Sequence, residues 1–483
     1  MATDLIDLGI KENISTEIIQ LISVETAWHF MVIPFEKKGV QLSLYIADTA
    51  NYEEVANELE ILIGYEITLR ELPESETRKE LGKYYRKNDR NKSQSKKLEL
   101  DNNNFLNTLI EEAITLNSSD IHIEPFEGKA RIRFRIDGVL IERFLIDKAD
   151  FPSLINKIKI QANLDIAEKR LPQDGRIFLG SQKTTKLDIR VSVLPTLHGE
   201  KAVLRLLRSS FDKINLNSLG FGEQALQNYL EGVKRPHGMV LISGPTGSGK
   251  TTTLYATLIL LNQTERNILT IEDPIEYTLE GINQVQLKES IGLDFPSALR
   301  TFLRQDPDVI MVGEIRDKET ASMAIRASLT GHVVFSTIHT NSAWGIVARL
   351  IDMGIPEYLI ADTLNTAVAQ RLVRKLCENC KEKQLFDEKF YPPQYKATRK
   401  VPYHSIPKGC EDCHYTGYRG RQAIYEVINI DYELSQCIKN AELNIKKRLK
   451  ESGHHSLADN AFELFETGVT SIGEVYPILT SDL

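Results

Sequence analysis

The segment GPTGSGKTT combines glycine, lysine and hydroxyl residues at a spacing that suits phosphate binding. Gly244, Gly249, Lys250 and Thr251 make the pattern G-x-x-x-x-G-K-T. Glycines let backbone N–H groups surround phosphate oxygens, the lysine neutralises the β and γ phosphates, and the threonine hydroxyl binds Mg²⁺. We therefore predict a nucleotide site, with Mg²⁺ on Thr251, formed by Gly244, Pro245, Thr246, Gly247, Ser248, Gly249, Lys250, Thr251 and Thr252.

Acidic residues follow two further apolar runs and could serve the same nucleotide. Glu272, Asp273 and Glu276 come just past a β-rich run, and Glu314 follows the run 309–312. A carboxylate at the carboxyl edge of a strand lies where α/β folds bind ligands, and there it orients a water or holds Mg²⁺. Such a residue is also often only a cap or an ion-pair partner. Because a phosphate loop precedes them, we predict that Glu314 and Glu272 act in catalysis and that Asp273 and Glu276 bind the nucleotide.

Histidines and arginines near these runs are further catalytic candidates. His332 precedes and His339 follows the apolar run VVFSTI, where a polar side chain at the end of a strand could sense the γ-phosphate. A histidine in such a place is more often structural. Arg300 and Arg304 are four residues apart, so we expect them on one face of a helix, where they could meet phosphate charge or the next subunit.

The elements that must hold these residues are buried strands, each followed by a helix. Residues 239–242 have the apolar character of a strand before the phosphate loop, and 252–261 have a helical pattern after it. The amino end of that helix adds partial positive charge to the site. We predict that this nucleotide-binding domain covers residues 213–376.

Four cysteines have the spacing of a metal site. Cys377-x2-Cys380 is followed, after 29 residues, by Cys410-x2-Cys413. Two such pairs can place four thiolates around one tetrahedral Zn²⁺, and four sulfurs leave no open position for catalysis. We therefore predict a structural zinc site in a subdomain over 377–413. The alternatives are an iron–sulfur cluster and two unrelated pairs, while Cys437 stands alone in a helical pattern and should be buried.

The region before the nucleotide-binding domain, 101–212, alternates helix and strand patterns. In RIRFRIDGVL, Arg131, Arg133 and Arg135 fall on one face of a predicted strand and apolar residues on the other. Three guanidinium groups on one face favour an anion, and Arg176 and Arg190 could join them. The alternative is a solvated face whose arginines pair with carboxylates.

The first part of the chain has no visible catalytic group. We expect a strand over 41–48, a helix over 50–64, and a docking domain over 1–82. A basic linker, 83–100, follows; within it Lys83 to Lys97 hold seven basic residues and one acidic residue, a net charge of +6. Such a segment contacts anionic lipid headgroups or is merely a solvated hinge.

Composition narrows the function classes. The 483 residues are 42% hydrophobic and 26% charged, which excludes disorder for the bulk of the chain. The net charge, 59 − 67 = −8, argues against a nucleic-acid partner. No apolar run approaches the roughly 18–20 residues of a membrane span, and the first residues lack the pattern of a signal peptide. We expect a cytoplasmic protein.

The motifs together resemble those of the secretion ATPase superfamily, and most closely the type II secretion and type IV pilus assembly ATPases. The resemblance covers nearly all of residues 100–430. GPTGSGKT is similar to the family's Walker A motif, TIEDPIEY to its aspartate box, DPDVIMVGEIRD to its Walker B motif and GHVVFSTIHTNSA to its histidine box. The cysteine pairs are also similar to those of the assembly branch, which retraction ATPases usually lack.

This resemblance implies a hexameric ATPase whose sites lie between subunits and between two domains of one subunit. Arginines of the preceding domain then reach the nucleotide, which adds five residues to the catalytic candidates: Arg131, Arg133, Arg135, Arg176 and Arg190. The implied partners are the inner-membrane platform and cytoplasmic-anchor proteins of a secretion or pilus machine, at the cytoplasmic face of the inner membrane.

We therefore expect an α/β multidomain fold: a RecA-like P-loop ATPase domain, a smaller PAS-like α/β domain and an N-terminal α/β docking domain before it, the zinc subdomain, and a helical region over 414–483. The predicted function is ATP hydrolysis that drives pseudopilus assembly in a type II secretion system, or, alternatively, type IV pilus assembly. A nucleic-acid motor and a nucleotide-gated scaffold with little turnover are the remaining alternatives.

Overall fold

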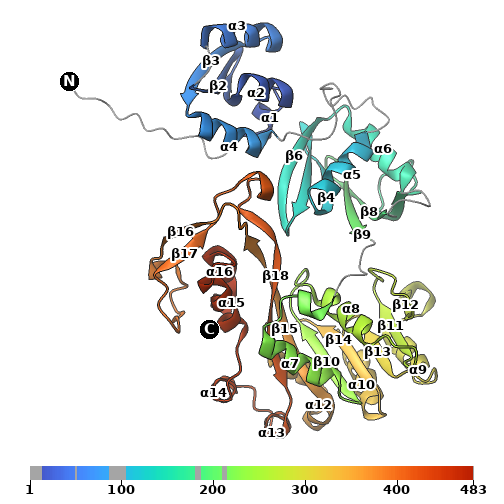
Figure 1. Cartoon of the computed structure of the whole chain (residues 1–483). Helices are drawn as coiled ribbons and strands as arrows, with labels where there is room; N and C mark the ends of the chain where they lie inside the picture. The colour runs from blue at the N-terminus through green and yellow to red at the C-terminus, as the bar shows by residue number, and fades with distance from the viewer. Residues whose placement is uncertain (1–13, 49–51, 86–104, 180–186, 209–214, 482–483) are drawn as a thin grey trace. The chain divides into compact units, whose positions relative to one another are not determined.

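The computed structural model describes residues 14–48, 52–85, 105–179, 187–208 and 215–481 (Figure 1). The chain forms two compact units. Unit 1 contains residues 1–209, 377–381 and 407–419, and unit 2 contains residues 210–376, 382–406 and 420–483. From residue 86 onward, the predicted basic linker lies outside the described residues. Within the described ranges, no helix has both the length and the apolar character needed to cross a membrane.

Unit 1 begins with a three-stranded sheet of order β1-β2-β3. The predicted strand is β2, which buries Leu42, Leu44 and Ile46 completely, and the predicted helix is α3. The predicted boundary at residue 82 cuts α4, which continues to Tyr84. The elements are α1 (Thr16–Ile19), α2 (Val24–Phe30), β1 (Val32–Lys38), β2 (Gln41–Ala47), α3 (Tyr52–Ile63), β3 (Glu66–Leu72) and α4 (Glu74–Tyr84).

The next part of unit 1 is a six-stranded antiparallel sheet of order β6-β5-β4-β9-β8-β7. Helices α5 and α6 bury their apolar sides against it, because each carries apolar residues at helical spacing. The elements are α5 (Phe105–Thr115), β4 (Ser118–Pro125), β5 (Lys129–Ile136), β6 (Val139–Asp147), α6 (Phe151–Gln161), β7 (Gln173–Leu179), β8 (Leu187–Thr196) and β9 (Gly199–Arg208).

Unit 2 is built on a seven-stranded sheet of order β12-β11-β13-β14-β10-β15-β18, in which the first six strands pair in parallel. Strand β10 is buried on both faces: Met239 and Leu241 join one apolar cluster, Val240 and Ile242 the other. This explains its continuous apolar sequence. The strands are β10 (Gly238–Ser243), β11 (Ile268–Glu272), β12 (Asn283–Gln286), β13 (Val309–Val312), β14 (Val333–Ile338), β15 (Leu364–Leu376) and β18 (Tyr418–Asn429).

Helices cover both faces of this sheet. Helices α7 and α8 pack in one cluster, and α9 to α13, α15 and α16 contribute to the other. The helices are α7 (Glu223–Val233), α8 (Lys250–Leu261), α9 (Phe295–Phe302), α10 (Lys318–Leu329), α11 (Gly345–Asp352), α12 (Glu357–Thr363), α13 (Tyr432–Lys439), α14 (Lys446–Glu451), α15 (Leu457–Glu466) and α16 (Ile472–Ser481), with short 3₁₀ turns at Leu216–Ser218, Glu289–Ile291, Glu388–Phe390 and Glu411–Cys413.

Two predictions of secondary structure were incomplete. The region 414–483 was expected to be helical, yet its first part forms β18, the edge strand beside β15 in Figure 1. Between the two cysteine pairs lies an antiparallel hairpin of β16 (Glu382–Leu385) and β17 (Tyr403–Ile406). The mixed α/β, multidomain character is confirmed.

Candidate nucleotide site and cysteine cluster

The predicted phosphate loop connects the carboxyl end of β10 to the amino end of α8. Three of its glycines have positive φ: Gly244 at 148°, Gly247 at 82° and Gly249 at 89°. A Cβ atom on Gly244 would lie 2.4 Å from the backbone oxygen of Gln370, and one on Gly249 would lie 2.9 Å from the Nε2 atom of the same residue. At Gly244 both the backbone angle and the nearby backbone oxygen exclude a side chain, whereas at Gly249 the backbone angle is the main reason for glycine.

Lys250, the first residue of α8, points back into this loop. Its Nζ donates hydrogen bonds to the carbonyl oxygens of Gly244 (2.8 Å) and Pro245 (3.1 Å). Burial lowers the pKa of Lys250, the charge of Glu314 opposes that effect, and the charge of Arg371 adds to it. The ammonium group therefore lies where phosphate oxygens would approach the loop, close enough to Glu314 to sense its charge.

Glu314 follows β13 after one residue and is held at the carboxyl edge of the sheet. Its carboxylate forms an ion pair with Arg316, and its Oε2 lies 3.6 Å from Nε2 of His339. The preceding residue, Gly313, donates its N–H to Ile271 of β11 (2.8 Å). The carboxyl ends of β11, β13 and β14 therefore meet around Glu314, as the sequence predicted.

Arg316 is a neighbour of Glu314 that was not among the predicted site residues. Its pKa is raised by the hydrogen bond to Glu314 and, more weakly, by the charges of Asp273 and Glu289, against the effect of burial. Arg316 thus links Glu314 electrostatically to the acidic loop, residues 273–282, which begins at Asp273. Its position two residues after Glu314, at the same strand end, was the available signal.

The three acidic residues after β11 have different environments. Glu272 ends β11, is 3% exposed, and accepts hydrogen bonds from Tyr255, from Thr270 Oγ1 (2.7 Å) and from Gln284 Nε2 (3.0 Å). Asp273 is exposed and Glu276 is half-buried. Glu272 therefore lies beneath the loop as part of a buried network, and the other two carboxylates are the ones available at its surface.

The structure separates the two predicted histidines. His339 follows β14 at the carboxyl edge, beside Glu314. His332 precedes β14 at the opposite edge, where its Nδ1 lies 2.9 Å from the carbonyl oxygen of Ala327 and 3.2 Å from Oγ1 of Thr330. Seven residues of strand span about 23 Å, so His332 does not belong to this unit's phosphate site. Its contacts are those of a residue that completes the end of α10.

The two predicted arginines of unit 2 do not share a helix face. Helix α9 ends at Phe302, so Arg300 lies in it and Arg304 lies two residues beyond its end. Arg300 pairs with Glu319 at 3.0 Å, and Nη1 of Arg304 donates to the carbonyl oxygen of Arg300 at 2.9 Å.

Strand β15 adds two residues that the sequence did not point to. Oε1 of Gln370 accepts a hydrogen bond from Thr253 (3.0 Å), and its other amide atom lies against Gly249. Arg371 donates to the carbonyl oxygens of Gln370 (3.1 Å) and Asn341 (2.9 Å), and burial lowers its pKa. Nothing in the local sequence revealed them, since their importance follows only from the pairing of β15 with β10.

In unit 1, β5 alternates as predicted, and its arginines have carboxylate partners from β4. Arg131 and Arg133 both bind Glu124, at 3.1 and 2.8 Å, and Arg135 lies 3.3 Å from Asp120. Burial alone would raise the pKa of Glu124, but the hydrogen bonds from Arg133 and Lys201 bring it down to about 2. The alternative of arginines paired with carboxylates is therefore what the structure contains.

The other two arginines of unit 1 lie on neighbouring strands. Arg176 of β7 and Arg190 of β8 are opposite one another in the antiparallel register. Arg176 also lies 3.8 Å from Asp188 and is about half exposed. All five predicted arginines thus belong to the same six-stranded sheet.

The four predicted cysteines gather in one cluster, with ligand atoms all within 4.8 Å of one another. The sulfur atoms of Cys377 and Cys410, and of Cys380 and Cys413, are 3.7 Å apart, and those of Cys410 and Cys413 are 3.8 Å apart. A tetrahedral metal about 2.3 Å from each sulfur requires sulfurs about 3.8 Å apart. The donor set therefore fits Zn²⁺.

Backbone amides support the sulfurs. The N–H groups of Cys410 (3.1 Å) and Gly417 (3.3 Å) donate to the sulfur of Cys413, and that of Gly409 donates to Cys380 (3.3 Å). Burial opposes ionisation of Cys413, but these two N–H groups lower its pKa. For Cys413, such contacts favour the thiolate that a metal needs.

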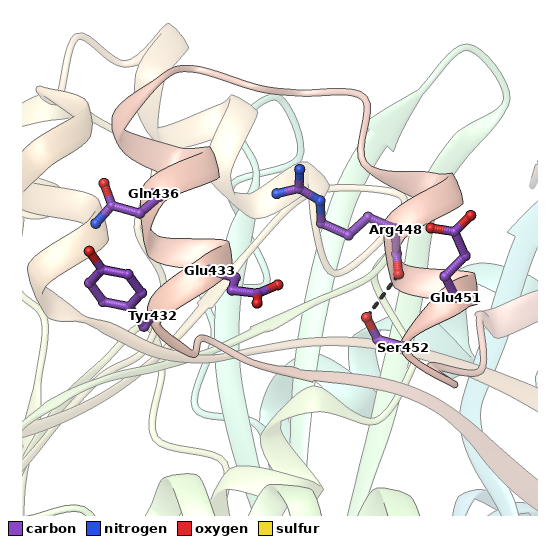
Figure 2. Close-up of a pocket in the computed structure, with 6 residues that line it drawn as sticks. All are labelled: Tyr432, Glu433, Gln436, Arg448, Glu451 and Ser452. Atoms are coloured by element: carbon purple, nitrogen blue, oxygen red, sulfur yellow. Dashed lines mark hydrogen bonds between the residues drawn. The ribbon is translucent and has the colours of Figure 1, made fainter.

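The lone Cys437 is buried in α13, as predicted, and the guanidinium group of Arg448 reaches its sulfur. Beside it, α13 and α14 border an open pocket of about 510 Å³ (Figure 2). Its lining residues are Tyr432, Glu433, Gln436, Arg448, Glu451 and Ser452. None of them is a predicted site residue, and none belongs to the elements of the phosphate loop.

The sequence of the chain is similar to those of known proteins. The family described as "Type II/IV secretion system protein" matches residues 56–477. The chain is 40% identical to the type IV pilus assembly ATPase PilB of Myxococcus xanthus over 96% of this chain and 87% of that protein. It is 48% identical to the type II secretion system protein E of Pseudomonas aeruginosa over 77% of this chain and 74% of that protein.

Two solved structures resemble the fold. The pilus retraction motor PilT with bound ADP is 26% identical, covers 76% of this chain and 95% of its own, and has a TM-score of 0.52. The ATPase DotB of Legionella pneumophila, at 23% identity, covers 78% of this chain and 96% of its own with a TM-score of 0.61, which supports the fold alone.

Proposed function

The chain belongs to the type II/IV secretion system protein family, and from this premise we propose that its ATP hydrolysis drives assembly of a pseudopilus in a type II secretion system. The broader statement, that the chain is an ATP hydrolase of the type II secretion and type IV pilus assembly group, follows from the family and its relatives. The observation that carries the proposal is the meeting of Lys250, Glu314 and the acidic loop at one edge of the sheet.

The chemistry proposed for this edge is attack of water on the γ-phosphorus of ATP. The loop amides and Lys250 bind the phosphate oxygens and balance the charge that moves toward the leaving ADP. Glu314 orients the water and accepts its proton, and His339 lies close enough to hold that carboxylate in place. Mg²⁺, held by the Thr251 hydroxyl, would supply further neutralisation of phosphate charge.

Arginines of the six-stranded sheet are proposed to complete this site during the cycle, within a homohexamer. Arg131, Arg133 and Arg135 are now bound to carboxylates, so each must exchange a carboxylate for phosphate when it acts. Such an exchange couples nucleotide binding to movement of a domain, which is the output that a motor needs. The domains are proposed to be RecA-like and PAS-like, as the resemblance implies.

The cysteine cluster is proposed to hold one structural zinc. Four sulfurs at the tetrahedral spacing leave no position for a substrate, so the metal would serve the fold of the segment around β16 and β17. The cytoplasmic setting proposed for this ATPase also favours zinc over disulfides.

A second candidate function is extension of a type IV pilus. It is favoured by the alignment to the Myxococcus PilB, which extends over 96% of this chain, whereas the type II secretion relatives match about 77% at higher identity. In either machine, the proposed partners are a platform protein in the inner membrane and its cytoplasmic anchor, with the basic linker near anionic lipid.

The test is replacement of the native gene by the Glu314→Gln variant, with Glu451→Gln as the control. Glu451 is an exposed carboxylate of α14, and α14 is not one of the elements that carry the phosphate loop or Glu314. We expect exported proteins to remain in the cell with surface pili unchanged. Loss of pili with normal export would instead support extension of a type IV pilus. Normal export together with normal pili would contradict both proposed functions. DNA-stimulated hydrolysis by the purified protein would instead support a nucleic-acid motor.

A further inference from the structure

A buried tyrosine of the helix that follows the phosphate loop contacts the acidic loop through its hydroxyl group. Tyr255 lies in α8, five residues after Lys250, and is 0% exposed. Its hydroxyl donates to the carboxylate of Glu272 and accepts the backbone N–H of Glu276 at 3.3 Å. Burial, and then the charge of Glu272, raise the pKa of Tyr255, so this hydroxyl keeps the proton that it donates.

The acidic loop needs such support because of its topology. Residues 273–282 connect β11 to β12, which are parallel neighbours, so the loop must return along the sheet without a crossover helix. Two side chains of β12 hold its far side. Gln284 accepts the N–H of Leu279 (2.6 Å) and donates to the oxygen of Tyr277 (2.9 Å), and Gln286 accepts the N–H of Ile275 (3.3 Å).

Tyr255 is the contact that comes from the nucleotide side. The β12 contacts fix the loop to an edge strand, whereas Tyr255 fixes it to the helix whose first residue is Lys250. The ring of Tyr255 also meets that of Tyr277 edge to face, with centroids 6.2 Å apart. The hydroxyl of Tyr255 therefore joins the acidic residues to α8, and Asn262 at the other end of α8 donates to the carbonyl oxygen of Glu280 (2.8 Å).

We propose that Tyr255 is a positioning residue for ATP hydrolysis: its hydroxyl holds Glu276 and the acidic loop in register with the phosphate loop. Glu272 takes part as the buried anchor of that hydroxyl rather than as a group that touches the nucleotide. The inference rests on the ATP hydrolysis proposed for this site and deepens it.

The first test compares Tyr255→Phe with Tyr229→Phe in the purified full-length protein. Each variant removes one buried hydroxyl from the same side of the sheet; that of Tyr229 bonds only Thr257 among the described contacts and is 2.7 Å from its Oγ1. A displacement of about 1 Å at a reacting group costs up to about 100-fold in rate. We therefore expect kcat to fall about tenfold for Tyr255→Phe, with KM for ATP within about twofold.

The control separates positioning from stability. Both variants should lose thermal stability, and Tyr255→Phe more, because it removes two hydrogen bonds and Tyr229→Phe removes one. Tyr229→Phe should keep kcat within about twofold of wild type. Equal kcat values for the two variants would overturn the inference. An inactive wild-type protein would instead contradict the proposed ATPase, so the two failures are distinguishable.

A double variant tests whether Tyr255 acts through the loop. If it does, adding Tyr255→Phe to Glu276→Gln should lower kcat little further, because the carboxylate that the hydroxyl positions is already gone. If the losses in kcat of the two single variants multiply in the double variant, the inference is overturned. A Glu276→Gln variant with normal kcat would also overturn it.

A substitution at a second position tests the same inference if Tyr255→Phe fails to fold. Gln284 is only partly buried and lies on the edge strand β12, so Gln284→Met should fold. Because it releases the same loop from the other side, we expect the same fall in kcat with little change in KM. Normal kcat in this variant would mean that the position of the loop does not limit hydrolysis.

Discussion

The nucleotide edge of unit 2 and the cysteine cluster both join residues that are distant in sequence, but different forces hold them. At the nucleotide edge, strands buried on both faces fix the backbone, and the charged groups are added at the strand ends. In the cluster, three of the sulfur–sulfur distances are 3.7–3.8 Å, and the sequence between the two cysteine pairs forms a hairpin whose strands have four residues each.

This difference predicts which changes affect activity and which affect folding. Charges at the end of a well-packed sheet can be removed without loss of the fold, because the core does not depend on them. Four close sulfurs depend on the ligand that they share, since metal binding then supplies folding free energy. The following predictions test that division.

Removing the metal should have the largest effect on stability. In Cys413→Ser we expect loss of the zinc that the wild type binds at about one per chain, and rapid proteolysis between the two cysteine pairs. Structural zinc contributes about 10 kcal/mol or more to such a segment. Zinc analysis and limited proteolysis measure both effects, and Cys437→Ser, which changes the buried lone cysteine, should keep its zinc. A Cys413→Ser protein with full zinc content would contradict the zinc site proposed at the four cysteines.

At the nucleotide edge, Glu314→Gln should remove activity and spare the fold. Loss of a general base typically costs about 100-fold or more in turnover. We expect that fall in kcat, ATP affinity within about twofold, and a melting temperature within a few degrees of wild type, as measured by phosphate release, ligand titration and calorimetry. A variant that unfolds would show that this carboxylate, with Arg316, is structural.

The sequence predicted best those residues whose roles depend on local spacing. The phosphate loop, Glu314 and the cysteine pairs each lie in a short pattern that already contains its chemistry. The helical period of 252–261 and the apolar run 309–312 also predicted the ends of α8 and β13 to within two residues. These patterns are local, so they can be recognised without knowledge of the fold.

Residues whose roles depend on pairing between strands were missed or misplaced. Arg371 became a neighbour of Lys250 only through the alignment of β15 with β10. His332 and His339 look equivalent in sequence, yet a strand has two ends and only one of them faces the phosphate loop. Arg304 fell outside its helix because α9 ends after eight residues.

Replacement by alanine should be tolerated less well at a glycine of the phosphate loop than at another glycine with a similar backbone conformation. Gly249→Ala adds backbone strain at φ 89° and a Cβ 2.9 Å from Gln370, whereas Gly292→Ala has φ 79° and no atom within 4 Å. Strain at such positions costs about 1–3 kcal/mol. We expect about 2 kcal/mol and about tenfold weaker ATP binding for Gly249→Ala, and a smaller loss with normal binding for Gly292→Ala, by denaturant unfolding and titration.

The carboxylate of Glu124 is held by Arg131, Arg133 and Lys201 through charge and hydrogen bonds. Its pKa of about 2 lies below the 4.5 of an unfolded glutamate, so the unfolded chain binds more protons between these values. The stabilisation is therefore complete above about pH 4.5 and is lost as the pH falls toward 2. We expect Glu124→Gln to lose about 1–2 kcal/mol at pH 7 and to converge with wild type near pH 2, as measured by hydrogen exchange in β4 and β5. The control is Glu127→Gln at an exposed position, which should keep the exchange protection of wild type at pH 7. A constant difference for Glu124→Gln down to pH 2 would assign the loss to packing instead of charge.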